Sequence, residues 1–171
     1  PNLHLFTTID QEGNIVGRLG HGNRFGSLYY QLSAGIRESD GWVLSDDFDT
    51  VTNDDGDILE DGDTRTNSQF SQWSGSLKVG GEWEGSELSL SANYIDAEKG
   101  IPPTVDPDDR SRYRKFPEWK KATVTAAGRK SFGENIELRA NIFYHKYDNV
   151  LQDYKDPGYS SLKWESTYDD Y

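Results

Sequence analysis

Hydrophobic and polar residues alternate along five segments of the chain, and a period of two is the pattern of a β-strand whose faces meet different surroundings. The clearest case is residues 136–145, where every even position is apolar. The same pattern covers residues 28–37, 73–82, 88–95 and 122–129, with weaker forms near 2–9, 14–22 and 160–169. It predicts an antiparallel, all-β protein of about eight strands.

The two faces of these strands differ in charge. One face of the five clear segments has only uncharged residues, such as Leu28, Leu77, Leu88, Val124 and Ile142. The opposite face carries six charged residues: Arg37, Lys78, Glu82, Arg129, Glu137 and Arg139. We expect the uncharged face to meet lipid, and the charged face to pair with neighbouring strands or with a second domain.

Short and long connections alternate between the strands. The short ones are residues 22–26, 84–86 and 131–135, where glycine supplies the positive φ of a tight turn. The long ones are residues 39–67, 97–118 and 148–160. Outer-membrane β-barrels have this asymmetry, with short periplasmic turns and long external loops. The connections therefore predict an up-and-down transmembrane β-barrel segment located in the outer membrane of a bacterial cell.

The composition excludes a membrane-spanning helix but not a membrane-spanning sheet. A transmembrane helix needs about 18–20 consecutive apolar residues. The chain has 171 residues, 33% of them hydrophobic, a mean hydropathy of −0.85 and no such run. A transmembrane strand turns only every second side chain to lipid, so a barrel can be polar on average. Cysteine is absent, which excludes disulfides and thiolate chemistry.

Charge and motifs argue against two classes of function. The net charge of −12 disfavours a nucleic-acid partner, because phosphate binding needs a basic surface. The three histidines lie far apart, and no Ser/His/Asp order, HExxH motif or glycine-rich phosphate loop is present. We therefore expect no enzymatic activity.

Carboxylates crowd the first long connection, between residues 46 and 63. Because Ca²⁺ prefers such oxygen ligands, five residues are candidate metal ligands: Asp54, Asp55, Asp57, Asp61 and Asp63. The segment does not match the EF-hand template, which would place Val51 where aspartate is required. Two interpretations stay open: a solvated acidic loop, and an irregular site for Ca²⁺ or a cationic ligand.

Three stretches carry a resemblance to a known family: residues 32–42 (LSAGIRESDGW), 88–102 (LSLSANYIDAEKGIP) and 138–149. In these stretches, and in its succession of strand, small turn, strand and long polar loop, the chain resembles the barrel portion of TonB-dependent outer-membrane receptors. The resemblance implies a barrel of about 22 strands with an N-terminal plug domain in its lumen. It also implies uptake of a metal chelate (siderophore) or a cobalamin-like nutrient, driven by the TonB complex.

Seven residues are candidate ligand contacts in the external loops: Trp42, Arg110, Arg112, Tyr113, Arg114, Tyr154 and Tyr159. The resemblance implies that the ligand is often an anionic chelate. Arginine recognises carboxylate or phosphate with a planar pair of donors, and aromatic rings stack on flat ligands. A plainer interpretation of the basic cluster is a salt-bridge network with the aspartates that precede it.

Two parts of such a receptor, the plug and the segment that engages TonB, have no counterpart in the sequence. The chain begins at Pro1, and the phase of Leu162, Trp164 and Tyr168 would turn Asp170 outward and Tyr171 inward. We therefore expect residues 1–171 to be a partial barrel domain. Two alternatives are a complete eight-stranded outer-membrane barrel with a structural or adhesive role, and a soluble calyx with its uncharged face inward.

Overall fold

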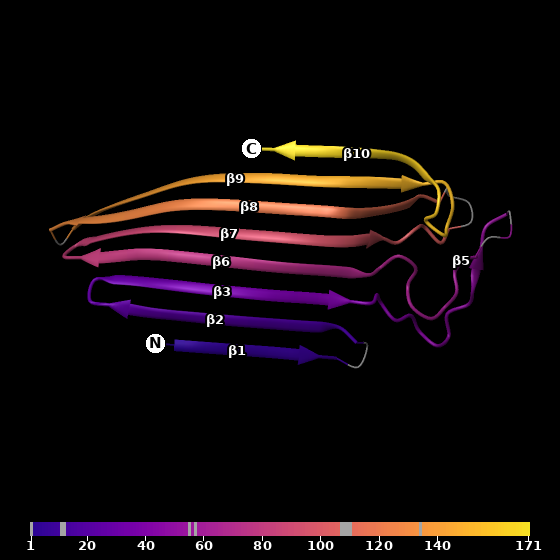
Figure 1. The fold of residues 1–171 in the computed structure, drawn as a ribbon, viewed down its shortest axis with the longest axis horizontal. Coiled ribbons are helices and arrows are strands. Elements are labelled where there is room, and N and C mark those ends of the chain that lie inside the picture. Colours follow the sequence, from indigo (N-terminus) through magenta and orange to yellow (C-terminus); the bar gives the residue numbers. More distant parts are fainter. Residues whose placement is uncertain (1, 11–12, 55, 57, 107–110, 134) are drawn as a thin grey trace.

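One antiparallel sheet dominates the computed structural model, and its strands follow one another in chain order (Figure 1). The structure describes every residue except 1, 11–12, 55, 57, 107–110 and 134. Within the described residues the sheet has eight strands: β1 (Asn2–Ile9), β2 (Ile15–Phe25), β3 (Leu28–Ser39), β6 (Phe70–Trp83), β7 (Ser86–Ile101), β8 (Tyr113–Phe132), β9 (Ile136–Tyr154) and β10 (Leu162–Asp170). A two-stranded sheet, β4 (Val51–Thr52) and β5 (Ile58–Glu60), lies in the first long connection.

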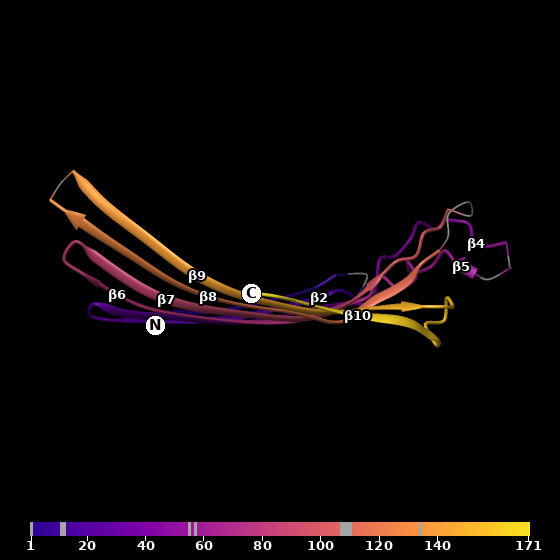
Figure 2. The ribbon, with the colours of Figure 1, turned by 90° about the horizontal axis from the view of Figure 1, so that it is seen from above.

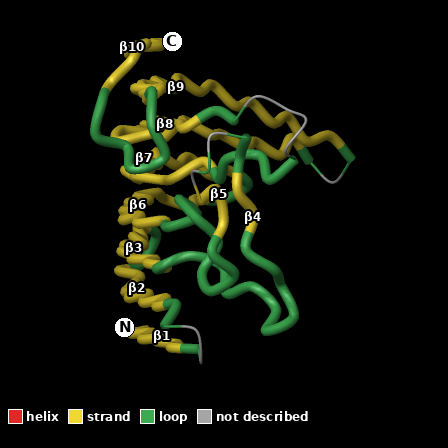
Figure 3. Tube along the Cα trace, turned by 90° about the vertical axis from the view of Figure 1, so that its right-hand side faces the viewer, coloured by secondary structure: helices red, strands yellow, loops and turns green. Residues whose placement is uncertain are grey.

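The predicted up-and-down architecture is confirmed, but the sheet is open. Its edge strands, β1 and β10, each pair with one neighbour, and they do not pair with each other. Figure 2 shows both ends of the sheet bending toward the same side, and Figure 3 shows the β4–β5 hairpin standing off the sheet at the end with the long connections. No helix long and apolar enough to cross a membrane occurs among the described residues.

Glycines close the short turns at the other end of the sheet. Gly26, Gly85 and Gly133 have φ values of 60°, 63° and 63°, which side chains with a Cβ rarely adopt. The first turn is tighter than predicted, because β2 continues to Phe25 and leaves only Gly26 and Ser27 between the strands. The predicted division into short and long connections is otherwise confirmed.

The strand register brings the uncharged residues of neighbouring strands onto one face, as the alternation predicts. Leu32 pairs with Leu77, and Leu77 pairs with Ala92. We call this the outer face; it holds the residues in phase with Leu77, and the inner face holds the others. On β2 the outer face also carries His21, which shares a hydrogen bond of 2.9 Å with the Tyr30 hydroxyl group.

Exposure distinguishes the two faces of β6. Trp73, Leu77, Val79 and Trp83 are exposed on the outer face, with Trp73 at 50% and Trp83 at 53%. Every inner-face residue of this strand, from Phe70 to Glu82, is half-buried although most are polar. Side chains crowd together inside a curved sheet, so we assign the inner face to the concave side.

The strands run further into the long connections than predicted, and the polarity of the faces reverses where the alternation was expected to stop. The reversal falls at a row of paired outer-face residues: Trp73, Asp96, Lys120, Asp148 and Asp169. We call this the boundary row. The part of the sheet on its short-turn side is the lower wall, and the part on its long-loop side is the upper wall.

The upper wall is charged outside and aromatic inside. Its outer face carries Glu98 and Glu118 above the boundary row, whereas its inner face carries Phe70, Trp119 and Tyr147. Burial follows the same change, because the inner-face residues Ala97, Asn149 and Asp153 are buried, at 2%, 9% and 3% exposure. The predicted loops 97–118 and 148–160 are therefore wrong in extent. The first is shortened because β7 continues to Ile101 and β8 begins at Tyr113, and the second because β9 continues to Tyr154.

The predicted phase of the last strand is also wrong. A β-bulge at Leu162–Trp164 shifts the register, so that Trp164 pairs with Asp153 and Tyr168 with Asn149 on the inner face. The ring of Tyr168 lies 6.0 Å from that of Tyr147. Asp170 is therefore on the inner face, while Tyr171 lies with Lys146, whose ammonium group is 5.7 Å from the Tyr171 ring, on the outer side.

Candidate functional site

Aromatic and cationic side chains gather on the inner face of the upper wall. The Lys99 ammonium group lies 4.9 Å from the ring of Phe116 and 4.7 Å from that of Trp119. Pro117 lies between Phe116 and Trp119 in the sequence. The pairing of β8 with β7 and its pairing with β9 both shift register there, because proline has no N–H to give to the ladder. The resulting bulge places both rings beside the same lysine.

The rings continue across the sheet from β8 to β10. Trp119 lies 5.6 Å from Tyr147, which in turn lies 6.0 Å from Tyr168. At the other side, on β3 and β6, the Arg37 guanidinium group lies 5.4 Å from the ring of Phe70. Cations over aromatic rings attract each other most strongly where water is partly excluded. This inner-face group therefore offers flat apolar surfaces next to fixed positive charge.

Two adjoining cavities open beside this group, where β3 ends, β6 begins and β7 meets β8. The first, of about 340 Å³, is lined by Phe70, Lys99 and Phe116. The second, of about 430 Å³, shares Phe70 and Lys99 and adds Arg37 and Trp42. Trp42, a predicted ligand contact, is 64% exposed and lies at this opening.

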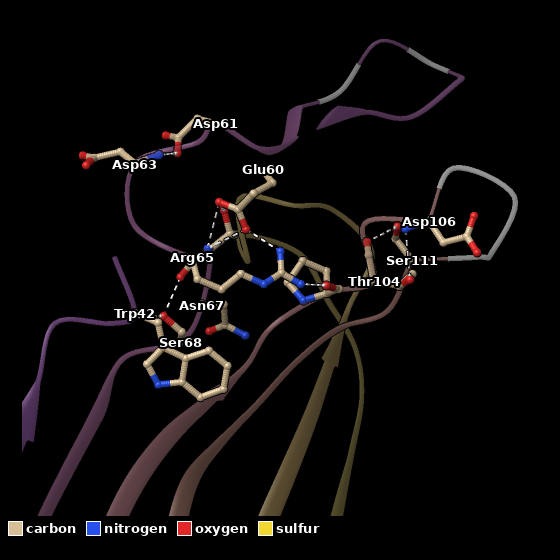
Figure 4. A network of polar contacts seen from close by, with 12 residues as sticks. Trp42, Glu60, Asp61, Asp63, Arg65, Asn67, Ser68, Thr104, Asp106 and Ser111 are labelled. Carbon is tan, nitrogen blue, oxygen red and sulfur yellow. Dashed lines mark hydrogen bonds and ion pairs between the residues drawn. The ribbon is translucent and has the colours of Figure 1, made fainter. Parts of the chain in front are cut away.

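A buried ion pair within the first long connection positions Arg65, which clasps this connection to the second. Glu60 is fully buried and accepts hydrogen bonds from the Arg65 guanidinium group and the Thr66 backbone N–H, which lies 3.0 Å away (Figure 4). Arg65 also donates to the Pro103 carbonyl. A buried charge is costly unless it is paired and hydrogen-bonded. Glu60 therefore holds the β4–β5 hairpin in one position over the ends of β7 and β8.

Asn67 and Tyr159 extend this clasp to the third connection. The Asn67 amide donates to the carbonyl oxygens of Ile101 and Arg114, at 2.8 and 2.6 Å. The Tyr159 hydroxyl beside it is buried and has no hydrogen-bond partner in the part of the chain that the structure describes. Burial raises the pKa of Tyr159 to about 12, although the nearby Asn67 amide opposes the rise. Three connections are thus joined at one point.

Three of the predicted ligand contacts, Tyr113, Tyr154 and Tyr159, come together at the strand ends, whereas Arg114 lies on the opposite face of β8. The Tyr159 ring lies 6.1 Å from Tyr113 and 5.5 Å from Tyr154. Arg114 Nε donates to Asp153 at 3.0 Å, and its guanidinium group lies 5.4 Å from the Trp164 ring. Tyr113, Arg114 and Tyr154 belong to strands, which corrects their predicted place in loops.

Those of the other predicted residues that the structure describes do not gather into a site. Arg112 is exposed, and Arg110 lies outside the described residues. Among the candidate metal ligands, Asp54, Asp61 and Asp63 are exposed, whereas Asp55 and Asp57 lie outside the described residues. No group of three acidic or histidine side chains that could hold a metal ion occurs in the described part of the chain. A Ca²⁺ site therefore stays a prediction.

Sequence analysis missed the inner-face group of Phe70, Lys99, Phe116, Trp119 and Tyr147. The sequence does carry the period of two of a strand at these positions. Trp119 and Lys121 alternate with Glu118 and Lys120, and Tyr147 and Asn149 lie on either side of Asp148. The apolar residues here lie on the opposite face from those in the lower wall of the same strands, so these segments were predicted as loops. Comparison with known proteins adds no family, since no family model, curated protein or solved structure matches the chain.

Proposed function

We propose that the chain supplies eight strands of the wall of a transmembrane β-barrel in a bacterial outer membrane, and that this barrel is a TonB-dependent receptor. In this proposal the lower wall spans the hydrocarbon layer and the upper wall stands in water outside the cell. The ligand is a metal chelate or a cobalamin-like nutrient. The protein binds it and lets it pass, and makes or breaks no bond in it.

The change of polarity at the boundary row is the observation that carries the membrane part of the proposal. A strand in one solvent keeps its apolar side chains on one face throughout. On β6 to β9 most of them lie on the outer face below the boundary row and on the inner face above it, with Phe143 and Val150 among the exceptions. A sheet that passes from lipid into water has this pattern, because its outside must be apolar in the first and polar in the second.

The height of the lower wall agrees with a membrane. On β6 the outer-face tryptophans, Trp73 and Trp83, bracket the uncharged residues. Ten residues of strand span about 33 Å, or about 23 Å along the membrane normal at a tilt of about 45°. Barrels of outer membranes carry an apolar band about 25 Å tall between aromatic girdles.

The soluble calyx explains these features less well. It would turn the lower wall's apolar side chains inward, but Leu88, Leu138 and Ile142 are exposed at 58%, 60% and 75%. It would also leave half-buried polar residues on the outside of β6. A small closed eight-stranded barrel remains the alternative membrane protein, yet it requires β1 to pair with β10, and these strands are the open edges of the sheet.

The upper wall supports the ligand-binding part of the proposal. The cavities beside Phe70 and Lys99 open at the long-loop end, where a barrel meets its external ligand. Lys99 and Arg37 supply positive charge, and Trp42 an exposed ring. Carboxylates of Glu38, Asp40 and Glu98 line the same opening, so the surface suits a partly flat molecule whose anionic groups meet Lys99 and Arg37.

Uptake by cells that make the natural protein tests the proposal. Cells with and without its gene are given radiolabelled ferric chelates and cobalamin, with and without an uncoupler that collapses the proton-motive force. We expect one ligand to accumulate only in energised cells that carry the gene. If cells with the gene accumulate none of these ligands, whether or not the uncoupler is present, the result would contradict a TonB-dependent receptor and favour the structural or adhesive barrel.

A further inference from the structure

A large hollow opens on the inner face of the lower wall, between β1 and β7. It has a volume of about 720 Å³, more than either cavity of the upper wall, and its polar lining includes Asn2, His4 and Gln31. Gly20 and Gly22, two inner-face residues of β2, give it a floor without side chains. Glycine inside a strand often marks a place where another group approaches the backbone closely. We call this cavity the lower hollow.

Tyr29 is held in place at the side of the lower hollow. Its hydroxyl group donates a hydrogen bond to Glu87 Oε1, at 3.0 Å, and the Lys78 ammonium group lies 5.5 Å from its ring. A Cβ atom at Gly80 would come within 2.5 Å of the Tyr29 ring, so any other residue there would displace it. Glycine at position 80 therefore lets the ring lie close to the sheet, beside Lys78.

The charges around the lower hollow are unequal in number. A second cavity, of about 350 Å³, adjoins it and shares Lys78 and Glu87. Among the described residues around the two cavities, four cations face three carboxylates, and all but Lys78 are ion-paired: Arg24 with Glu82, Arg129 with Glu87 and Glu137, and Arg139 with Glu137. Lys78 is half-buried. One half-buried positive charge is therefore left without a carboxylate where the two cavities meet.

The inner face above the lower hollow is cationic, although the chain as a whole has a net charge of −12. Between the lower hollow and the boundary row, the charged residues that β2 to β9 place on this face are Arg18 and Lys121. A carboxylate, Asp170, follows only on the edge strand β10. An anion that moves down from the upper wall therefore meets positive charge as far as Lys78.

We infer that the lower hollow is a second binding site, which takes a small organic anion and holds its carboxylate on Lys78. The ammonium group gives the carboxylate charge-assisted hydrogen bonds, the Tyr29 ring covers one side of the molecule, and the Gln31 amide hydrogen-bonds its polar groups. One cation acts here and two act in the upper wall, so the lower hollow is the weaker site and the affinity of the upper wall does not depend on it. In the proposed receptor this site receives the ligand after the upper wall, and that role rests on the proposed function.

Acetylation of single lysines, followed by mass spectrometry of the natural protein in detergent, tests the site with citrate as the anion. Only the uncharged amine reacts, and a bound carboxylate covers the amine and favours its charged form. We expect citrate to slow the acetylation of Lys78 about fivefold. Lys121 is the matched control, because it is an exposed lysine of the same face outside the lower hollow, and its rate should stay unchanged. An equal effect of citrate on both lysines, or none on Lys78, would overturn the site.

A pair of glycine variants tests the shape of the lower hollow without changing charge. Gly20→Leu fills it, because a Cβ atom at Gly20 would meet only the Leu32 carbonyl oxygen, at 3.8 Å, and the side chain extends into the cavity. Gly75→Leu adds the same side chain on the outer face, where the nearest atom is 4.0 Å from the new Cβ. We expect the citrate effect on Lys78 to disappear in the first variant and to persist in the second.

Two further outcomes would overturn the site. A citrate effect on Lys78 that survives Gly20→Leu would show that the anion does not occupy the lower hollow. Resistance of Lys78 to acetylation without citrate would show that another part of the natural protein already covers it. The acetylation is measured in detergent and requires no uptake, so these outcomes are distinct from a failure of the uptake experiment.

Discussion

The lower and upper walls are parts of the same strands, yet they are built by opposite rules. In the lower wall Leu77 and Ile142 are exposed on the outer face, while Ser76 and Asn141 lie on the inner face. In the upper wall the outer face is charged, and aromatic rings such as Trp119 and Tyr147 lie inside. The proposed membrane location accounts for this difference, because it places the lower wall in lipid and the upper wall in water.

A charge placed in the middle of the lower wall gives the largest expected effect. Leu77→Arg is expected to destabilise the natural protein in lipid vesicles by about 2–4 kcal/mol, because the proposed function places the outer face there in hydrocarbon. Val150→Arg puts the same charge on the outer face of the upper wall and should change stability by less than about 0.5 kcal/mol. Equilibrium unfolding in guanidinium measures both. An equal loss of stability in the two variants would contradict the claim that the outer faces of the two walls meet different solvents.

The clasp between the long connections gives the next largest effect. Glu60→Ala leaves the partly buried Arg65 without its carboxylate and is expected to cost about 2 kcal/mol, locally rather than globally. Hydrogen exchange should accelerate in residues 58–69 and stay unchanged in the lower wall. Asp63→Ala, which removes an exposed carboxylate from the same segment, is the control. Equal exchange in both variants would show that the ion pair does not hold the hairpin.

The inner-face cations of the two walls should differ in how much they contribute to the affinity for the ligand. Lys99→Gln in the upper wall is expected to weaken binding of an anionic ligand about tenfold, through the loss of a charge-assisted contact. Lys78→Gln in the lower wall removes a similar cation, which lies 5.5 Å from the Tyr29 ring, and should change affinity less than twofold. Titration calorimetry with the ligand found in the uptake experiment makes the comparison.

Replacing Tyr159 is expected to have the smallest effect on stability at neutral pH. Its hydroxyl is buried and makes no hydrogen bond within the described residues, so Tyr159→Phe should change stability by less than about 0.5 kcal/mol. Burial raises the pKa of Tyr159 from 10.0 to about 12, so the folded state holds the proton longer than the unfolded state. The stabilisation is complete below pH 10 and falls between pH 10 and pH 12. Hydrogen exchange of the third connection should show this loss in the natural protein and not in the phenylalanine variant.

The lower wall could be predicted from the sequence because its alternation has one dominant cause, the contrast between its faces. Each predicted strand occurs, and pairs such as Leu32 with Leu77 follow from the pattern. The upper wall could not, because its apolar residues change face and its bulges at Pro117 and Leu162–Trp164 interrupt the period of two. The phase of Trp164 depends on such a bulge.

The candidate site was predicted only in part for the same reason. Tyr113, Tyr154 and Tyr159 were chosen for their chemistry, and the fold brings them together, but Arg114 lies on the opposite face of β8. The clasp of Glu60 and Arg65 joins segments through a buried contact that no local pattern marks. Phe70 and Lys99 acquire their roles from strand pairing.

Accessibility of single spin labels along β7 tests the change of solvent most directly. The chain has no cysteine, and any cysteine elsewhere in the natural protein is replaced by serine, so a cysteine introduced at residue 88, 90, 92, 96 or 98 labels one outer-face position at a time in lipid vesicles. We predict that the labels at 88, 90 and 92 collide with oxygen, which concentrates in lipid, and those at 96 and 98 with a water-soluble nickel complex. The same accessibility at all five positions would contradict a membrane boundary at Asp96.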